Sequence, residues 1–428
     1  MKLKYHFLSG LILACGLGLS SCNDSFLERN PKDQLSDVSF WKTADDANKY
    51  ATGIYLYLIE PENHTIMTDC YTDNAIPVHV GAEQGVLSAG TAVSSNPHFL
   101  QLWQAAYETI RRCQIFYEHI GEVSMNEKAK AQLTAEVQFL EAFAYHNLWK
   151  YMGGVPILDH PLQLNEPLPA RSSAEETYEY VVKLLDKAAP NLPEIRTAAD
   201  HGKASAGACY ALKARMAFYN HKYDVAEAAA EQVMQTGKFG LYPNYGDLFQ
   251  PVAETCNEIL FDREYVENPK NGSEGSVIGL FFSPVDFGGW EALSPTQDMV
   301  DAYPCTDGKS IAESPLYNPA KPFENRDPRL AYSIFWPGTT CGPMTFNNKY
   351  MGDGSHTRTG YSMRKYINPD NYGIQNYDWT NFIYIRYAEV LLTYAEARNE
   401  NLSAPDAKVY DARSEERRVG KECLRLCR

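Results

Sequence analysis

After its first two dozen residues the chain has no apolar stretch approaching the roughly 20 residues that a helix needs to cross a bilayer. Basic residues are also in short supply. The chain has 39 lysines and arginines against 54 aspartates and glutamates, a formal net charge of −15. Because binding to nucleic-acid phosphates needs a basic surface, this balance argues against nucleic acid as a partner. About 400 residues still suffice for one large domain or two or three average ones.

Cysteines at paired spacings are missing as well. Of the ten cysteines, six lie scattered through the body of the chain, and no two stand at a metal-ligand spacing. Six in so long a chain do not resemble a disulfide scaffold, so we expect most of them to be buried free thiols. The six are Cys70, Cys113, Cys209, Cys256, Cys305 and Cys341.

Motifs that carry enzyme chemistry are absent too. The ten histidines form no His-Glu-x-x-His pattern, and there is no Gly-x-Ser-x-Gly elbow or phosphate-cradling loop. We therefore predict a protein that is not an enzyme and has no cofactor. Calcium stays open, because Asp69, Asp73, Asn74 and the Gly352-Asp353-Gly354 turn carry suitable oxygens, although without the regular ligand spacing of a calcium loop.

The first 22 residues have the organisation of an export signal. Lys2 and Lys4 precede an apolar run from Phe7 to Leu19, which is long enough for a signal peptide and too short for a membrane span. The residues Leu19-Ser20-Ser21-Cys22 resemble a bacterial lipobox, which predicts lipid attachment at Cys22 after removal of residues 1–21. An ordinary secretory signal with a chance cysteine is the alternative.

Four blocks of the chain show the apolar periodicity of helices. In the third block Ser173 and Glu176 form a capping box, and an alanine-rich helix pair resembles a tetratricopeptide unit, which needs stacked neighbours to bury its apolar face. We predict three or four such units. The blocks are Trp41–Ile59; Phe99–Ile120 with Glu127–Tyr151; Ser173–Gly237, including Ala204–Tyr219 and Tyr223–Thr236; and Trp379–Asn399, which is apolar nearly all round.

Between Leu241 and Asn381 the helical periodicity fades, while proline, glycine, asparagine and aromatic residues accumulate. More than a hundred such residues are too many for one plain loop, so we expect a packed, irregular subdomain. It contains short strand-like runs such as Val277–Phe282. Because binding residues gather on loops held by a rigid scaffold, this insertion is where a ligand site is expected.

Short landmarks spread along the chain carry a family resemblance. They are Phe26-Leu27-Glu28 with Pro31, Phe40-Trp41, Gly202-Lys203-Ala204, Asp247-Leu248-Phe249, Pro295-Thr296, Val300-Asp301-Ala302-Tyr303, Asp307-Gly308-Lys309, Asn325 to Leu330, Ile385 to Leu392 and Tyr394-Ala395-Glu396-Ala397. Each is weak alone, but in this order the chain, from Cys22 to about Ala412, resembles the SusD/RagB outer-membrane lipoproteins of gut-type Bacteroidetes.

This resemblance implies a mostly α-helical fold, in which a tetratricopeptide-like repeat scaffold carries an irregular, loop-rich insertion with short strands. The expected parts are a signal peptide (1–21), an N-terminal helical part (22–240), a ligand-facing insertion (241–380) and a C-terminal helical part (381–412). It also implies a protein anchored by lipid in the outer membrane and facing the cell exterior. There it would bind oligosaccharide or polysaccharide and deliver it, without catalysis, to a SusC-like TonB-dependent transporter.

Candidate ligand-binding residues are aromatic side chains in loops, together with amide and carboxyl neighbours, because an aromatic face packs against a sugar ring while polar groups bind its hydroxyls. Trp290, which follows two glycines expected to leave its face open, is the first candidate, and Trp336 before Pro337 is the second. Tyr71 with Asp73 and Asn74 forms a third candidate after the first helix. The remaining tryptophans after the signal, Trp41, Trp103, Trp149 and Trp379, are expected on apolar helix faces in the core.

We interpret the charged residues of these landmarks as structural and not catalytic. Glu389 and Glu396, two helical turns or about 10.5 Å apart with Arg386 close by, suit an ion-pair network between repeats better than a catalytic carboxylate pair. Arg326, Asp327 and Arg329 are expected to pin the insertion to the scaffold.

The segment from Arg413 to Arg428 is basic and shows no helical face, so we interpret it as a non-native tail, with a divergent terminus as the alternative. For the function, three alternatives to glycan capture stay open: capture of peptides or glycopeptides by the same system, a lipid-anchored glycoside hydrolase, and a structural lid without ligand affinity.

Overall fold

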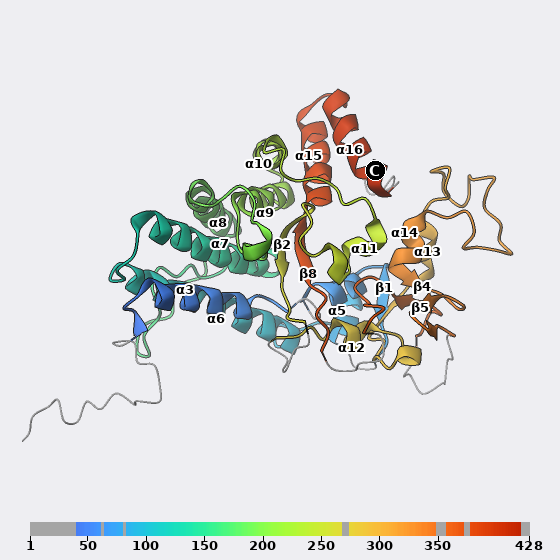
Figure 1. Ribbon diagram of the computed structural model, residues 1–428. Helices are drawn as coiled ribbons and strands as arrows, with labels where there is room; N and C mark the ends of the chain where they lie inside the picture. Colours follow the sequence, from blue (N-terminus) through green and yellow to red (C-terminus); the bar gives the residue numbers. More distant parts are fainter. Residues whose placement is uncertain are drawn as a thin grey trace, which may run out of the picture.

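Figure 1 shows the computed structural model, which describes residues 40–60, 64–79, 83–267, 274–347, 357–371 and 377–420. Cys22, the Gly352-Asp353-Gly354 turn and residues 421–428 lie outside the described residues. The helices of the scaffold are α3 (Ala44–Ile54), α6 (Pro97–Ile120), α7 (Glu127–Met152), α8 (Ala174–Ala188), α9 (Ala206–Tyr219), α10 (Tyr223–Gln235), α15 (Tyr387–Asn401) and α16 (Ala407–Gly420).

Shorter helices and strands occupy the rest of the described chain. The short helices are η2 (Tyr55–Tyr57), η3 (Ile66–Tyr71), α5 (Glu83–Ser88), η4 (Ala189–Asn191), η5 (Ala198–Asp200), α11 (Tyr245–Leu248), η6 (Pro251–Ala253), α12 (Ile278–Phe282), η7 (Val285–Phe287), α13 (Gln297–Ala302) and α14 (Pro328–Ser333). The strands are β1 (Ala75–Pro77), β2 (Ile259–Arg263), β3 (Leu293–Pro295), β4 (Ile334–Phe335), β5 (Thr340–Cys341), β6 (Met344–Thr345), β7 (Ser362–Met363) and β8 (Phe382–Arg386).

The long helices stack in sequence order, which confirms the predicted tetratricopeptide-like scaffold. Helix α6 packs on α7, α7 on α8, α8 on α9 and α9 on α10, and α15 and α16 continue the stack from α10 (Figure 1). The alanines of α9 and α10 are mostly buried, and these small side chains let the two helices pack closely. The helical repeat therefore resumes with α15 and α16 after the insertion.

Local sequence explains where these helices begin and end. The Ser173 hydroxyl accepts a hydrogen bond from the Glu176 amide and the Glu176 carboxylate accepts one from the Ser173 amide, so the predicted capping box opens α8. Asn126 caps α7 by accepting hydrogen bonds from the amides of Lys128 and Ala129. Helix α7 ends at Gly153, whose φ of 69° is in the left-handed region that glycine tolerates.

The insertion between α10 and α15 is built from short elements, as predicted. The described residues form four antiparallel sheets of two strands each; β5 and β6 form a local hairpin, whereas the other three pairs join strands that are far apart in the sequence. Strand β1 comes from the N-terminal part and pairs with β3, so that Ile76 lies opposite Ser294. Strand β2 pairs with β8 in the middle of the molecule, between the stacked helices and the insertion (Figure 1).

Two predicted elements are wrong. The block from Trp379 to Asn399 is not helical throughout, because β8 occupies Phe382–Arg386 and the helix α15 starts only at Tyr387. Four of the five strand residues are buried, and a strand buried on both faces gives the same continuous apolar run as a buried helix. Conversely, the strand-like run Val277–Phe282 contains the short helix α12.

The tryptophans expected in the core are divided. Trp41 is buried, whereas Trp149 and Trp379 are only partly buried and Trp103 on α6 is 36% exposed. Trp379 also lies outside any helix, in the segment before β8. The prediction of free thiols is confirmed: all six cysteines are unpaired, and all but Cys256 are fully buried.

Charged side chains around Pro328 form hydrogen bonds within the insertion. The Arg326 guanidinium donates hydrogen bonds to the carbonyl oxygens of Pro322, Val300 and Tyr303, all within the insertion. Arg329 pairs with Asp327 through two hydrogen bonds of 2.9 Å. They surround a small separate core of Val300, Leu330 and Ile334. For Arg326 the expectation that it pins the insertion to the scaffold is therefore wrong, while for Asp327 and Arg329 it stays a prediction.

Helix α16 runs to Gly420, so the first residues of the basic tail are helical. Whether the tail is native stays a prediction. None of the helices in the described ranges is both long and apolar enough to cross a membrane.

Candidate functional site

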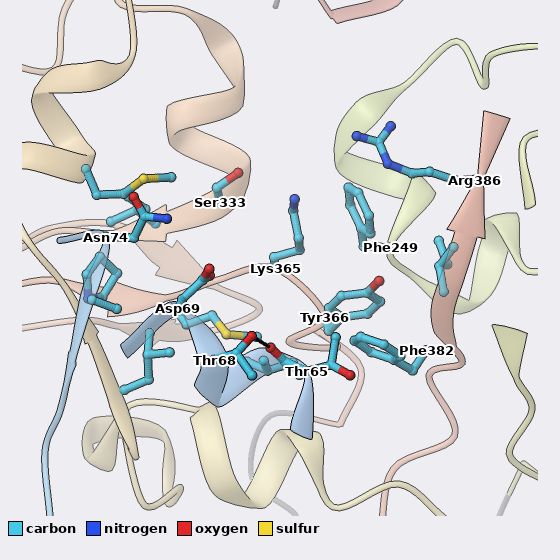
Figure 2. Close-up of a pocket in the computed structure, with 18 of the residues that line it drawn as sticks. Thr65, Thr68, Asp69, Asn74, Phe249, Ser333, Lys365, Tyr366, Phe382 and Arg386 are labelled. Atoms are coloured by element: carbon cyan, nitrogen blue, oxygen red, sulfur yellow. Dashed lines mark hydrogen bonds between the residues drawn. The ribbon is translucent and has the colours of Figure 1, made fainter. Parts of the chain in front are cut away.

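A cavity of about 460 Å³ lies where three parts of the chain meet: η3 and β1, the insertion, and β8 with the start of α15. This volume lies within the range of about 300–1,000 Å³ that is typical of small-molecule sites. Figure 2 shows the Lys365 ammonium and the Asp69 carboxyl reaching into the space between Asn74 on one side and the rings of Phe249, Tyr366 and Phe382 on the other.

Aromatic rings form one wall of the cavity. The Phe249 and Tyr366 ring centroids are 5.2 Å apart, those of Tyr366 and Phe382 5.0 Å, and those of Phe382 and Tyr384 5.3 Å. Each ring packs mainly against its neighbours, and all four side chains are buried or nearly so. The wall is therefore a rigid apolar surface with little open ring area.

Tyr366 has a φ of +66°, a left-handed backbone conformation that is a genuine outlier for a bulky residue. Such strain persists only where the surrounding packing enforces it, and it is concentrated at functional sites. Here it aims Tyr366 into the aromatic wall, while its neighbour Lys365 points to the polar side of the cavity (Figure 2).

The polar centre of the cavity combines opposite charges. The Lys365 ammonium lies 4.3 Å from the Phe249 ring centroid and 5.1 Å from that of Tyr245, which is a cation–π arrangement. Asp69 is exposed to solvent, and its carboxyl is partly desolvated by the protein around it. This desolvation raises its pKa, although the Asn74 side chain and the Lys365 charge oppose the shift.

Two ion pairs fix the floor of the cavity to the rest of the molecule. Arg215 on α9 forms a bidentate pair with Glu389, with both N–O distances 2.5 Å, and also donates to the Tyr384 carbonyl oxygen at 2.6 Å. Arg386 donates to the Glu258 carboxylate at 2.9 Å. The Arg215–Glu389 pair joins α9 to α15 and confirms the ion pairing expected between repeats. Arg386, by contrast, pairs with Glu258 in the insertion.

One of the predicted ligand residues, Asn74, lines this cavity. Its carbonyl oxygen accepts a hydrogen bond from the Thr296 amide at 2.9 Å, which fixes β1 against the start of α13. The carbonyl oxygen of Asp73 accepts a hydrogen bond from the Thr296 hydroxyl, and its side chain is exposed outside the cavity lining.

Trp290 lies away from the cavity but is 49% exposed, so it is available to a ligand. We expected the two preceding glycines, Gly288 and Gly289, to leave the face of Trp290 open, but they have a different role. Gly288 takes a φ of 90° in a tight turn, and a Cβ on Gly289 would lie 2.3 Å from the Ser283 carbonyl oxygen. They therefore shape the backbone turn, and one side of Trp290 packs on Phe281 at a centroid distance of 4.9 Å.

Trp336 and Tyr71 are engaged within the protein. Trp336 stacks on Phe323 with a centroid distance of 4.4 Å and an interplanar angle of 10°, so one of its faces is covered. The Tyr71 hydroxyl is 2.6 Å from His98 Nε2. Neither residue lines the cavity, and the ligand role predicted for both stays a prediction.

Sequence reasoning missed the residues that make up most of this site, among them Lys365, Tyr366, Phe382 and Ser333. They come from separate short segments with no motif of their own, and only the fold brings them together. Asp69 was considered only as a calcium ligand, and Phe249 only as part of a family landmark. The apolar run before Arg386 was the one available signal, and it was assigned to a helix.

Two family models match most of the chain. The model described as "SusD family" matches residues 257–412, and the one described as "Starch-binding associating with outer membrane" matches residues 25–218. The chain belongs to the SusD/RagB family. SusD-like protein P38 of Formosa agariphila is 26% identical over 432 residues, which is 93% of this chain and 79% of that relative.

Solved structures of SusD-like proteins have the same fold. A SusD-like protein from Bacteroides fragilis is 26% identical and superimposes with a TM-score of 0.76, covering 91% of this chain and 86% of its own. Surface glycan-binding protein A from Bacteroides thetaiotaomicron, in complex with laminarihexaose, is 20% identical with a TM-score of 0.68, covering 88% of this chain and 87% of its own.

Proposed function

We propose that the protein is a glycan-binding protein of the outer membrane, and that an oligosaccharide binds in the cavity at the junction of η3, the insertion and β8. The observation that carries this proposal is the combination, in one cavity of about 460 Å³, of an aromatic wall with the polar groups of Asp69, Asn74 and Lys365. Sugars present both C–H faces and hydroxyls, so a site for them needs both kinds of surface.

The relatives support this proposal. The family model for the N-terminal part is described as starch-binding and associated with the outer membrane, and one structural neighbour was solved with a bound laminarihexaose. Lipid attachment at Cys22, a surface-facing orientation and transfer of the glycan to a SusC-like transporter complete the proposed role.

The role is proposed to be non-catalytic. Hydrolysis of a glycosidic bond usually requires two carboxyl groups that are free to act on the substrate. The acidic residues that line the cavity are Asp69 and Glu389, and both oxygens of Glu389 are held by Arg215. Among the described residues that line the cavity, Asp69 is then left without a partner carboxylate that is free to act.

Affinity electrophoresis of the purified protein through gels containing soluble polysaccharides, laminarin among them, tests the proposal. We expect at least one polysaccharide to retard the protein, and Lys365→Ala and Asp69→Asn to weaken the retardation about tenfold each, the value of a charge-assisted hydrogen bond. The matched control is Trp103→Ala, which removes an exposed tryptophan on α6 and leaves the retardation unchanged.

Two outcomes would contradict the assignment. If Trp290→Ala abolishes retardation while Lys365→Ala does not, the glycan binds at the exposed tryptophan. If no glycan retards the folded protein, peptide capture becomes the better account. The juxtaposed ammonium of Lys365 and carboxyl of Asp69 favour that second candidate, because they match the two charged ends of a peptide.

A further inference from the structure

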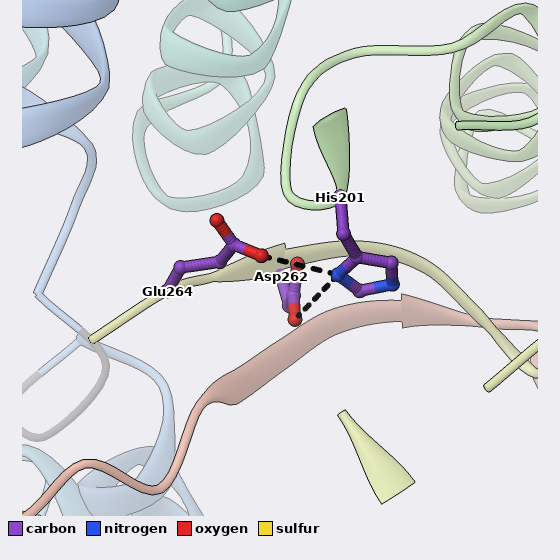
Figure 3. Close-up of side chains that lie close together, drawn as sticks. All are labelled: His201, Asp262 and Glu264. Atoms are coloured by element: carbon purple, nitrogen blue, oxygen red, sulfur yellow. Dashed lines mark hydrogen bonds and ion pairs between the residues drawn. The ribbon is translucent and has the colours of Figure 1, made fainter. Parts of the chain in front are cut away.

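A second cluster of polar side chains lies outside the cavity, where the scaffold meets strand β2. His201 stands in the segment between η5 and α9, Asp262 on β2, and Glu264 directly after β2. His201 Nδ1 is 3.2 Å from Glu264 Oε1 and 3.7 Å from Asp262 Oδ2, and one possible ligand atom from each residue lies within 4.8 Å of the others. Figure 3 shows the three side chains converging.

These distances are close to those of a metal site. Zinc binds histidine nitrogen and carboxylate oxygen at about 2.0–2.2 Å in a tetrahedral arrangement, which places the ligand atoms about 3.4 Å from one another. The two distances from His201 Nδ1 are on either side of that value. Small rotations of Asp262 and Glu264 would therefore bring all three atoms around one ion.

Asp262 supplies an independent indication that a ligand is missing from its surroundings. Its side chain is 1% exposed, and its Oδ1 atom has no hydrogen-bond partner. The other oxygen, Oδ2, has two long contacts, 3.4 Å to the Asn381 amide nitrogen and 3.7 Å to His201 Nδ1. Because leaving a buried carboxylate oxygen without a partner is unfavourable, a cation beside it would stabilise this arrangement.

The residues around this cluster add a further negative charge, and a small cavity adjoins it. The Glu254 carboxyl is near enough to interact with both His201 and Asp262. Arg196, which lines the small adjoining cavity, is committed to Glu136 at 2.6 Å. Gly202 has a φ of +76°, and a Cβ there would lie 2.5 Å from the Glu264 carboxyl carbon, so glycine is what allows Glu264 to lie beside His201.

We propose that His201, Asp262 and Glu264 bind a divalent transition metal, for which Zn²⁺ is the best fit, with water in the fourth position. One imidazole and two carboxylates suit zinc. Calcium is disfavoured because it takes six to eight oxygen ligands.

The role of such an ion would be structural. It would join the start of α9 in the scaffold to β2, and β2 pairs with β8, which lines the glycan cavity. The residue before β8 also contacts the proposed metal site directly. Asn381, which precedes β8, contacts Asp262 and donates its backbone amide to Glu254 at 2.9 Å. The metal would therefore stabilise the base of the cavity without touching the ligand.

Zinc titration of the untagged, metal-stripped protein against a chromophoric chelator tests the proposal. We expect wild type to bind one more equivalent of zinc than His201→Ala and Glu264→Gln do, and zinc to raise the melting temperature of wild type only. Circular dichroism shows whether each variant is folded. Two variants at different ligands keep the test valid if one of them fails to fold.

His160→Ala is the matched control. His160 also has two carboxylate neighbours, Asp159 at 2.6 Å and Glu166 at 2.7 Å, but they bind opposite ring nitrogens and cannot share one ion with it. This variant should keep the full zinc stoichiometry. Equal zinc binding by wild type and folded His201→Ala, or a melting temperature that only calcium raises, would overturn the proposal. Neither result depends on glycan binding.

Discussion

The scaffold and the insertion of this SusD-family protein are stabilised in different ways. In the scaffold each long helix packs on its neighbour in the sequence, and its ends are set by local caps. In the insertion the described elements are short, and most strands pair with partners far along the chain, as β1 does with β3 and β2 with β8. The cavity that we propose as the binding site lies where the two regions meet and distant segments converge.

The largest effect is expected from Phe261→Ala, which removes the main apolar link between the two regions. Phe261 on β2 is 1% exposed, and its ring centroid is 4.7 Å from that of Phe139 on α7 and 5.8 Å from that of Tyr384 on β8. We expect a loss of about 4 kcal/mol in the free energy of unfolding, measured by urea denaturation. Leu164→Ala, at a side chain that is 99% exposed, should change stability little. Similar losses of stability in Phe261→Ala and Leu164→Ala would contradict the conclusion that scaffold and insertion share one apolar core.

A somewhat smaller effect is expected from Arg215→Ala, which breaks an ion pair between two scaffold helices, α9 and α15, and a hydrogen bond from α9 to β8. The variant leaves Glu389 without its bidentate partner and the Tyr384 carbonyl oxygen without its donor. The expected loss is about 3 kcal/mol, at the lower end for a buried ion pair because Glu389 is one-third exposed. Lys49→Ala breaks a surface pair with Asp45 and should cost under about 0.5 kcal/mol. Equal losses would show that the Arg215 pair stabilises the stacked helices no more than a surface pair does.

The pH dependence of stability tests a buried charge that belongs to the scaffold alone. Burial raises the pKa of Glu141 on α7 to about 7 from its ordinary 4.5, while hydrogen bonds from Tyr180, Tyr117 and Gln114 oppose the shift. Because the folded state holds this proton more tightly, the stabilisation is complete below pH 4.5. It is lost as the pH rises through about 7.

This difference in pKa corresponds to at most about 3 kcal/mol. We therefore expect the free energy of unfolding to fall more steeply between pH 5 and 8 in wild type than in Glu141→Gln. Glu122→Gln, at an exposed position, serves as the control and should keep the wild-type slope. Identical slopes for wild type and Glu141→Gln would show that Glu141 does not titrate in this range.

The smallest effect is expected from Ser173→Ala, which removes a local cap. Loss of the hydrogen bond that the Ser173 hydroxyl accepts from the Glu176 amide should cost about 1 kcal/mol. Hydrogen exchange should quicken in the first turn of α8 and remain unchanged in β8. Faster exchange in β8 would mean that the scaffold caps and the insertion are coupled more tightly than the packing indicates.

The same difference between regions explains what the sequence could predict. The bounds of α6, α7, α9 and α10 follow from periodicity and caps, which are local, and the structure places them within two residues of the predicted blocks. The insertion could be recognised only by its composition. Its described strands have two to five residues, and most of them depend on distant partners, as β8 does on β2; β8 was therefore mistaken for the start of a helix.

The site shows the same limit. Asn74 was predicted because it stands beside polar and aromatic neighbours in the sequence. Lys365 and Tyr366 also stand among such neighbours, but nothing in that run distinguishes it from the other polar and aromatic runs of the insertion. Trp290 was chosen as a large aromatic residue in a glycine turn, and the structure does leave it half exposed. The exposure of one aromatic side chain in the insertion could thus be predicted. Which distant residues come together at the boundary with the scaffold could not.

Hydrogen–deuterium exchange with a bound oligosaccharide tests most directly whether the ligand binds at this boundary. The ligand would be the oligosaccharide prepared from whichever polysaccharide retards the protein in the affinity gels. We predict slower exchange in η3 and β1, around Lys365 and Tyr366, and in β8. Protection confined to the turn around Trp290, with no change in η3 or β8, would contradict the account.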